Sequence, residues 1–188
     1  YELGIGAGWS DLESAPSAKR ARPAQGEAMS TPLVSGVIPT HNRCTLLPRA
    51  VQSVLAQTVR DVEIIVLDDG SVDATAEVGR SFRPPVRYHH QFNQGLGGAR
   101  RNAVALASGQ YIALLDDDDE WLPEKLERQL AALTDRPGTD FCYSQARLVF
   151  QDGRTVVKPA ASQGYEELLV QRTRIPPSSL LVRRDRVL

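Results

Sequence analysis

The chain has 188 residues, of which 41% are apolar and 24% charged, and its formal net charge is −1. That length is enough for one domain with a buried core, and the near-zero charge gives no chain-wide bias toward nucleic acid. No apolar run approaches the roughly 20 residues that cross a bilayer, and the first residues lack the basic start and apolar core of a signal peptide.

The chain begins with a segment that reads poorly as structure. Residues 1–28 are rich in Gly, Ala, Ser and Pro and show no sustained periodicity. They predict a disordered arm, or upstream or tag sequence, ahead of a native start at Met29. The glycine-rich run 4–8 imitates a dinucleotide loop, but no strand precedes it. We expect the folded domain to span residues 29–188.

The apolar pattern of the next hundred residues predicts alternating strands and helices. In chain order these are strand 33–38, helix 49–57, strand 62–67, helix 74–81, strand 86–90, helix 98–108, strand 111–115 and helix 123–133. Asp73 or Ser71 is expected to cap the second helix, and Gly109 to end the third. Such βαβ units predict an α/β, Rossmann-like fold with a mostly parallel sheet and helices on both faces.

The last part of the chain follows a different pattern. Residues 141–150 and 155–157 flank Asp152-Gly153, which predicts a hairpin turn. Residues 183–188 resemble the opening of a helix, and one or two helical turns are marginal alone. We therefore expect a fragment of a longer protein.

The two cysteines, Cys44 and Cys142, lack the Cys-x-x-Cys spacing of zinc or redox sites. We expect two buried free thiols in a reducing, cytoplasmic setting.

Polar clusters follow three of the predicted strands, at residues 39–43, 68–71 and 116–119. Because ligands of open α/β sheets lie outside the carboxyl ends of the strands, these clusters predict one ligand site. The four aspartates 116–119 repel one another, and a bound Mg²⁺ or Mn²⁺ relieves that repulsion. The alternative is an acidic loop whose aspartates cap the helix after Pro123.

Asp69 follows an apolar strand and precedes Gly70, which directs its carboxylate to the ligand edge, where it is able to accept a base N–H. The alternative is a turn-forming aspartate, a role we prefer for Asp68. His41 lies in the first of the three clusters and is a candidate for stacking on a base. We interpret His89 and His90 as ordinary strand-end residues.

The segment 95–102 joins a strand to a helix, and its glycines allow the backbone to approach a phosphate. Arg101 is a candidate for bidentate phosphate binding, whereas Arg100 is interpreted as a surface charge. A GxGxxG dehydrogenase loop is disfavoured, because Arg100 replaces the third glycine and the loop follows the third strand.

Taken together, residues 33–133 resemble the family 2 glycosyltransferases of the GT-A fold. The resemblance is carried by five ordered motifs: VIPTHNR at 37–43, SVLAQT at 53–58, DDGSVDAT at 68–75, NQG and ARRN within 93–102, and LDDDDEWLPEKL at 115–126. Tyrosine is commoner in the family where His41 stands.

This resemblance implies a role for each candidate residue. Pro39, Thr40 and Asp69 would contact the uracil, Arg101 the base or diphosphate, Asp116 or Asp117 the ribose, and Asp118 the metal, Mn²⁺ or Mg²⁺. His41 and Asn42 complete the expected nucleotide-sugar site. The expected activity is metal-dependent sugar transfer, with inversion, from a UDP- or dTDP-sugar to a hydroxyl of a glycan, lipid-linked or other acceptor, as in cell-envelope polysaccharide synthesis.

The family's catalytic base lies further along the chain, so we expect it beyond Leu188. Glu166 and Glu167 resemble helix residues and are not assigned that role. Two alternatives stay open: a module that binds a nucleotide-sugar without transferring it, and a nucleotidyltransferase. The second is disfavoured, because this sequence lacks the glycine-rich basic loop that a nucleotidyltransferase has after its first strand. We expect a cytoplasmic protein, free or peripherally bound at the inner face of the membrane, with no nucleic-acid partner.

Overall fold

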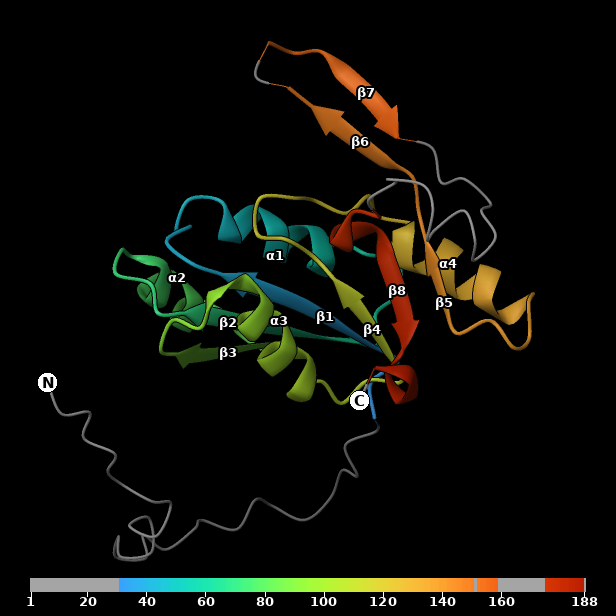
Figure 1. Ribbon diagram of the computed structural model, residues 1–188, viewed down its shortest axis with the longest axis horizontal. Coiled ribbons are helices and arrows are strands. Elements are labelled where there is room, and N and C mark those ends of the chain that lie inside the picture. Colours follow the sequence, from blue (N-terminus) through green and yellow to red (C-terminus); the bar gives the residue numbers. More distant parts are fainter. Residues whose placement is uncertain (1–30, 151, 159–174, 188) are drawn as a thin grey trace, which may run out of the picture. The chain divides into compact units, whose positions relative to one another are not determined.

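The computed structural model describes residues 31–150, 152–158 and 175–187 (Figure 1). The arm expected over residues 1–28, the start at Met29, and Glu166 and Glu167 lie outside these residues. Within the described part, no helix has the length and apolarity that crossing a membrane requires.

The described residues form two sheets and four α-helices. The strands are β1 (Val34–Thr40), β2 (Val62–Asp69), β3 (Val86–Gln91), β4 (Tyr111–Leu114), β5 (Phe141–Tyr143), β6 (Ala146–Val149), β7 (Thr155–Lys158) and β8 (Leu180–Arg183). The helices are α1 (Leu47–Leu55), α2 (Thr75–Ser81), α3 (Gly95–Ala105) and α4 (Lys125–Thr134), with short 3₁₀ turns at Pro177–Ser179 and Arg184–Arg186.

The main sheet has the strand order β3-β2-β1-β4-β8-β5. Strands β1 to β4 are parallel, and β8 runs antiparallel to both of its neighbours. The chain winds outward from β1 to β3 and then returns to place β4 on the other side of β1. That reversal is the topological switch point at which open α/β sheets bind ligands.

Helices cover both faces of this sheet, as Figure 1 shows for α3 in front of β1 and β2. Alternate residues of β1 feed two cores: Val34 and Ile38 pack with α1 and α4, whereas Val37 packs with α3. The buried residues of α1 recur at helical spacing, Leu47, Ala50, Val51 and Val54, so the amphipathic pattern explains its docking. The predicted α/β architecture is therefore confirmed.

The helix boundaries differ from the predicted ones. Helix α1 begins two residues before Arg49, and α4 begins at Lys125 rather than in the turn at Pro123. Helix α3 begins at Gly95 instead of Gly98 and ends at Ala105, before Gly109. The N-cap of α2 is Ala74, which makes no side-chain capping hydrogen bond, so the predicted cap at Asp73 or Ser71 is wrong; Asp73 instead accepts the Thr75 N–H (2.9 Å) in the turn before the helix.

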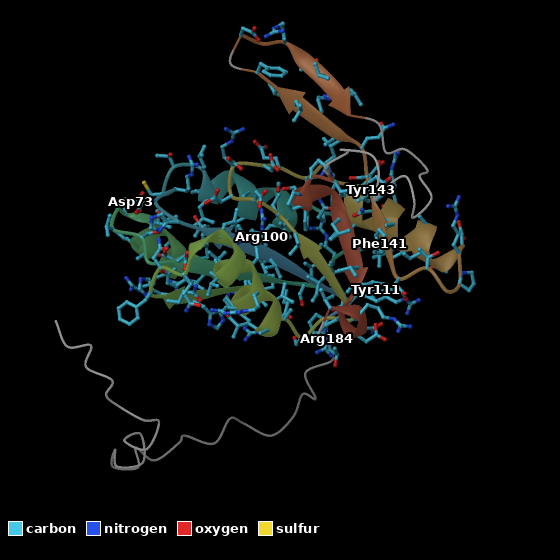
Figure 2. All side chains as sticks on the ribbon, viewed as in Figure 1. Asp73, Arg100, Tyr111, Phe141, Tyr143 and Arg184 are labelled. Atoms are coloured by element: carbon cyan, nitrogen blue, oxygen red, sulfur yellow. The ribbon has the colours of Figure 1, made fainter. Side chains whose placement is uncertain are left out.

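The C-terminal part corrects two expectations. Residues 141–150 are divided: β5 joins the main sheet, and β6 forms the predicted hairpin with β7 around Gly153. Residues 180–183 form β8, a strand inserted between β4 and β5. Among the described residues of the segment expected to open a helix, 183–187, there is one 3₁₀ turn at Arg184–Arg186 and no α-helix. Tyr111 and Arg184 in Figure 2 mark the start of β4 beside this turn, where the Arg184 N–H donates to the Gln110 carbonyl.

The cysteines are free, as expected. They are half-buried rather than buried: Cys44 lies in the loop after β1, and the Cys142 thiol donates to the Gln129 carbonyl at 3.6 Å.

Candidate functional site

The carboxyl ends of β1, β2 and β4 surround a cavity of about 370 Å³. Seven of the predicted residues line it: Pro39, Thr40, His41, Asp69, Asp116, Asp117 and Asp118. Five others line it as well: Arg43, Asn93, Gly95, Leu96 and Ala99. The three polar clusters of the sequence therefore meet at one edge of the sheet, whereas Asn42 and Arg101 do not line the cavity.

Asp69, the last residue of β2, is almost fully buried, with 3% of its surface exposed. Its Oδ1 accepts hydrogen bonds from Gln91 Nε2 (2.6 Å) and from the Gln94 N–H (2.8 Å). Gly70 then turns the chain with φ 75°, and a β-carbon on it would lie 2.8 Å from the Asn93 backbone nitrogen. The turn thus needs glycine for its conformation and for space.

Asp68 has the structural role that the sequence favours. Its Oδ1 accepts the Ser71 N–H (2.9 Å), which closes the turn after β2, and its Oδ2 accepts the Tyr88 hydroxyl (2.7 Å). Burial and this bond to Asp68 raise the pKa of Tyr88, so the phenol stays a donor.

His41 and Asn42 form a directed chain of hydrogen bonds at the rim. The Val72 N–H donates to Asn42 Oδ1 (2.8 Å), which turns Asn42 Nδ2 toward His41 Nε2 (3.0 Å). His41 Nδ1 faces the Asp69 carbonyl at 2.8 Å, and a carbonyl only accepts. These contacts fit a ring that donates from Nδ1 and accepts at Nε2, and Asn42 holds this ring from a left-handed backbone conformation, φ 55°.

The acidic loop, residues 116–119, is held by a residue far along the chain. The Ser178 hydroxyl accepts the Asp116 N–H (3.0 Å) and donates to Asp119 Oδ2 (2.6 Å). Trp121, just after the loop, donates its indole N–H to the Ser178 carbonyl (2.8 Å). The turn before β8 therefore fixes the loop that follows β4.

Carboxylates crowd this loop. Burial and the nearby Asp118 raise the pKa of Asp117, against the opposing effects of Thr40 and Arg43. Burial also raises the pKa of Asp119, together with the charges of Asp118 and Asp116 and against the Ser178 hydroxyl. The loop thus gains from any positive charge that enters the cavity.

The residues present fit a magnesium-like cation that is shared with a ligand. No group of three or more metal-ligating side chains comes together in the described part of the chain, so a cage built from protein alone is absent there. Mg²⁺ needs one or two carboxylates and takes its other ligands from phosphate and water. Asp118, exposed at the cavity wall beside Asp117, supplies a donor set of that kind.

The structure corrects the interpretation of the two arginines. Arg100, expected as a surface charge, forms an ion pair with Asp116, and its Nε is buried without a hydrogen-bond partner among the described residues (Figure 2). Arg101, expected at the phosphate, is exposed, and its side chain contacts the neighbouring Asn102. Successive helical residues point about 100° apart around the helix axis, so only one of this pair faces Asp116.

Several residues of the site were not singled out from the sequence. Arg43 directly follows the predicted Asn42, Asn93 opens the quoted NQG motif, and their polarity just after strands was a usable signal. Gln91 and Ser178 carry no such signal, because each acts through a partner far away in sequence. His89 and His90 lie on β3 and do not line the cavity, as expected.

Comparison with known proteins gives a family match and a match of fold. The family model described as glycosyl transferase family 2 matches residues 35–178. An uncharacterized glycosyltransferase of Rickettsia typhi is 33% identical over 141 residues, which cover 73% of this chain and 44% of that protein.

Two solved structures share the fold. Staphylococcus aureus TarS 1–349 in complex with UDP-GlcNAc aligns with a TM-score of 0.58 and 18% identity, over 81% of this chain and 45% of that one. The mannosyltransferase PcManGT of Pyrobaculum calidifontis, in complex with GDP-Man and Mn²⁺, aligns with a TM-score of 0.56 and 21% identity. The alignment covers 62% of this chain and 36% of that one. The expected GT-A fold is thereby confirmed, and the chain spans less than half the length of each of these proteins.

Proposed function

The chain belongs to glycosyltransferase family 2, and from this premise we propose that it binds a UDP- or dTDP-sugar for inverting transfer to an acceptor hydroxyl. The proposal assigns the cavity at the ends of β1, β2 and β4 to the nucleoside diphosphate. TarS was solved with UDP-GlcNAc and PcManGT with GDP-Man, which supports a nucleotide-sugar as the ligand class.

One observation carries the proposal: Asp69 and Asp118, 49 residues apart, line the same cavity. A nucleoside diphosphate needs a polar group for its base and a cation site for its phosphates, joined by a span that one cavity can hold. Had the two carboxylates been on opposite faces of the molecule, this function would have had no site. A cavity of about 370 Å³ is within the range of small-molecule sites.

The proposed roles follow the position of each residue. Asp69, with Pro39 and Thr40, receives the pyrimidine; Asp116 or Asp117 receives the ribose. His41, with Asn42 behind it, closes the base end of the cavity. For the diphosphate, Arg43 lines the cavity and is a better candidate cation than Arg101.

In the proposed reaction, the acceptor oxygen attacks the anomeric carbon from the side opposite the diphosphate. The bond from that carbon to the diphosphate oxygen breaks, and a base removes the acceptor proton. A Mn²⁺ or Mg²⁺ ion held by Asp118 would neutralise charge on the leaving diphosphate, and the cationic Arg43 would add to this effect.

Isothermal titration calorimetry with UDP, dTDP and CDP in the presence of Mn²⁺ tests the proposal. We expect wild-type binding to UDP, a fall of at least about tenfold in Asp118→Asn, and loss of most affinity in EDTA. Asp135→Asn, an exposed carboxylate at the end of α4, is the matched control and should bind like wild type.

Absence of UDP binding by the wild type, or equal binding by Asp118→Asn, would contradict the proposal. Incubation with a UDP-sugar and mixed glycan acceptors then separates the two functions of the same cavity. Release of UDP supports transfer, whereas binding without release supports a donor-binding module.

A further inference from the structure

Two amide side chains and one carboxylate, from three different elements, form a continuous chain of hydrogen bonds behind the cavity. Asn102, on α3, donates from Nδ2 to Gln91 Oε1 (2.8 Å) at the end of β3. Gln91 in turn donates from Nε2 to Asp69 Oδ1 (2.6 Å) at the end of β2. Neither amide lines the cavity, so both reach it only through Asp69.

This hydrogen-bond chain has a fixed direction, because the NH₂ group of an amide donates and its oxygen accepts. Asn102 Nδ2 also donates to Gln94 Oε1 (3.2 Å), so two carbonyl oxygens converge on this one nitrogen. That arrangement requires Gln91 to present its oxygen to Asn102 and its NH₂ to Asp69. Flipping either amide would set like groups against each other.

The direction of this hydrogen-bond chain determines the orientation of Asp69. Oδ1 receives two donors, Gln91 Nε2 and the Gln94 N–H (2.8 Å), and therefore does not hold a proton toward them. Two fixed donors on one oxygen also fix the rotation of the carboxylate. Oδ2 accepts no hydrogen bond from the residues that the structure describes and is the oxygen left for a ligand.

We propose that Gln91 and Asn102 are positioning residues that fix the rotation of the Asp69 carboxylate, present its Oδ2 to the ligand as an acceptor, and so select a pyrimidine with N–H at ring position 3. Uracil and thymine carry a hydrogen there, whereas cytosine carries a lone pair that an acceptor oxygen of Asp69 repels. The inference rests on the proposed function, since it concerns the base of the same nucleoside diphosphate.

Gln91→Glu is the central test, because the change is nearly isosteric. When protonated, the introduced carboxyl group still donates to Asp69 and mimics the glutamine amide, but when ionised it repels Asp69. We expect UDP affinity, divided by the wild-type value at the same pH, to fall about tenfold between pH 5 and pH 8. A residue that merely supported the fold would not produce this low-pH rescue. Gln52→Glu, the same change on the exposed face of α1, is the control and should show a flat ratio.

Two further arms use calorimetry with Mn²⁺ at pH 7. The wild type should prefer UDP to CDP by at least about tenfold, and Asn102→Asp should reduce that preference to roughly threefold, because its carboxylate attracts the Gln91 NH₂ away from Asp69. In an Asp69→Ala background, Gln91→Glu should change UDP affinity by less than about twofold, since coupled residues are not additive.

The outcomes separate the two proposals. A wild type that binds neither UDP nor dTDP overturns the proposed function and this inference with it. A wild type that binds UDP, with a flat pH ratio for Gln91→Glu or an undiminished UDP preference in Asn102→Asp, overturns the positioning role alone. Circular dichroism of each variant at both pH values establishes that the compared proteins are folded.

Discussion

Arg100 of helix α3 forms an ion pair with Asp116, the first carboxylate of the acidic loop, and the two side chains are 27% and 26% exposed. Partial burial makes the pair stronger than a surface ion pair, and it places a positive charge among four successive aspartates. Arg100 therefore neutralises part of the negative charge of the acidic loop, and a bound cation would neutralise more of it.

We predict that Arg100→Ala lowers UDP affinity about tenfold in the presence of Mn²⁺, equal to ~1.4 kcal/mol. Without Arg100, Asp116 remains as an unpaired, half-buried carboxylate beside Asp117 and repels the diphosphate. Isothermal titration calorimetry measures the change.

Arg101→Ala is the control for this prediction, since it removes the same charge from the next residue, which is exposed and does not line the cavity. Its affinity should stay within about twofold of wild type. Equal losses in the two variants would show that overall charge, rather than the ion pair with Asp116, sets the affinity.

The arginine pair shows how far the sequence determined the site. Strand-end clusters at residues 39–43, 68–71 and 116–119 predicted the site, because parallel strands direct their carboxyl ends to one edge. The side chain that pairs with Asp116 depends on the rotation of α3, which starts three residues earlier than predicted. A shift of one residue along a helix changes direction by about 100°, so residue type alone does not assign the role.

Strand β8 marks a second limit. Its residues, Leu-Leu-Val-Arg at 180–183, form a short apolar run that by itself indicates neither a strand nor a partner. Its pairing with β4 and β5 joins segments that lie about 40 to 70 residues apart in the sequence. Ser178, which precedes this strand and holds the acidic loop, was unpredictable for the same reason.

Gly70→Ala tests the turn that follows Asp69. The new methyl group would meet the Asn93 nitrogen at 2.8 Å, and the backbone there has φ 75°, so we expect a loss of about 2 kcal/mol in the free energy of unfolding. Urea denaturation measures the loss. Gly97→Ala is the control: it lies in α3 with nothing within 4 Å, so alanine should leave stability unchanged or raise it by about 0.5 kcal/mol.

Glu63 should make stability depend on pH in the acid range. Its burial opposes ionisation, but hydrogen bonds from Ser35, Ser108 and Arg87 outweigh it and lower the pKa of Glu63 from 4.5 to about 2. A lowered carboxyl pKa stabilises the fold above pH 4.5, and this contribution is lost as the pH falls toward 2.

Because Arg87 is 46% exposed and solvent weakens its share, we expect the contribution to be about 2 kcal/mol. Urea denaturation between pH 2 and pH 6 should show this decline in the wild type. Glu63→Gln should be less stable at pH 6 and should lack this part of the decline. If the Glu63→Gln variant is as stable as wild type at pH 6, the assignment is refuted.

The charged form of Lys125 should destabilise the fold, whereas ionised Glu63 stabilises it. Its side chain is 9% exposed, its Nζ lies 4.0 Å from the centre of the Trp121 ring, and Nζ has no hydrogen-bond partner in the described part of the chain. Burial lowers the pKa of Lys125 from 10.5 to about 7. The unfolded chain thus keeps a proton that the folded protein releases, and stability should rise as the pH increases from 7 toward 10.5.

Lys125→Met removes the buried ammonium and keeps the length of the side chain. We expect it to raise the free energy of unfolding by about 1 kcal/mol at pH 7, since attraction to the Trp121 ring offsets part of the burial cost, and to bring no gain near pH 10. Trp121 fluorescence, measured in a Trp9→Phe background because the chain has two tryptophans, should titrate with a midpoint near pH 7 and lose that transition in Lys125→Met. A methionine variant less stable than wild type at pH 7 would mean that the Lys125 ammonium has a binding partner in the folded protein.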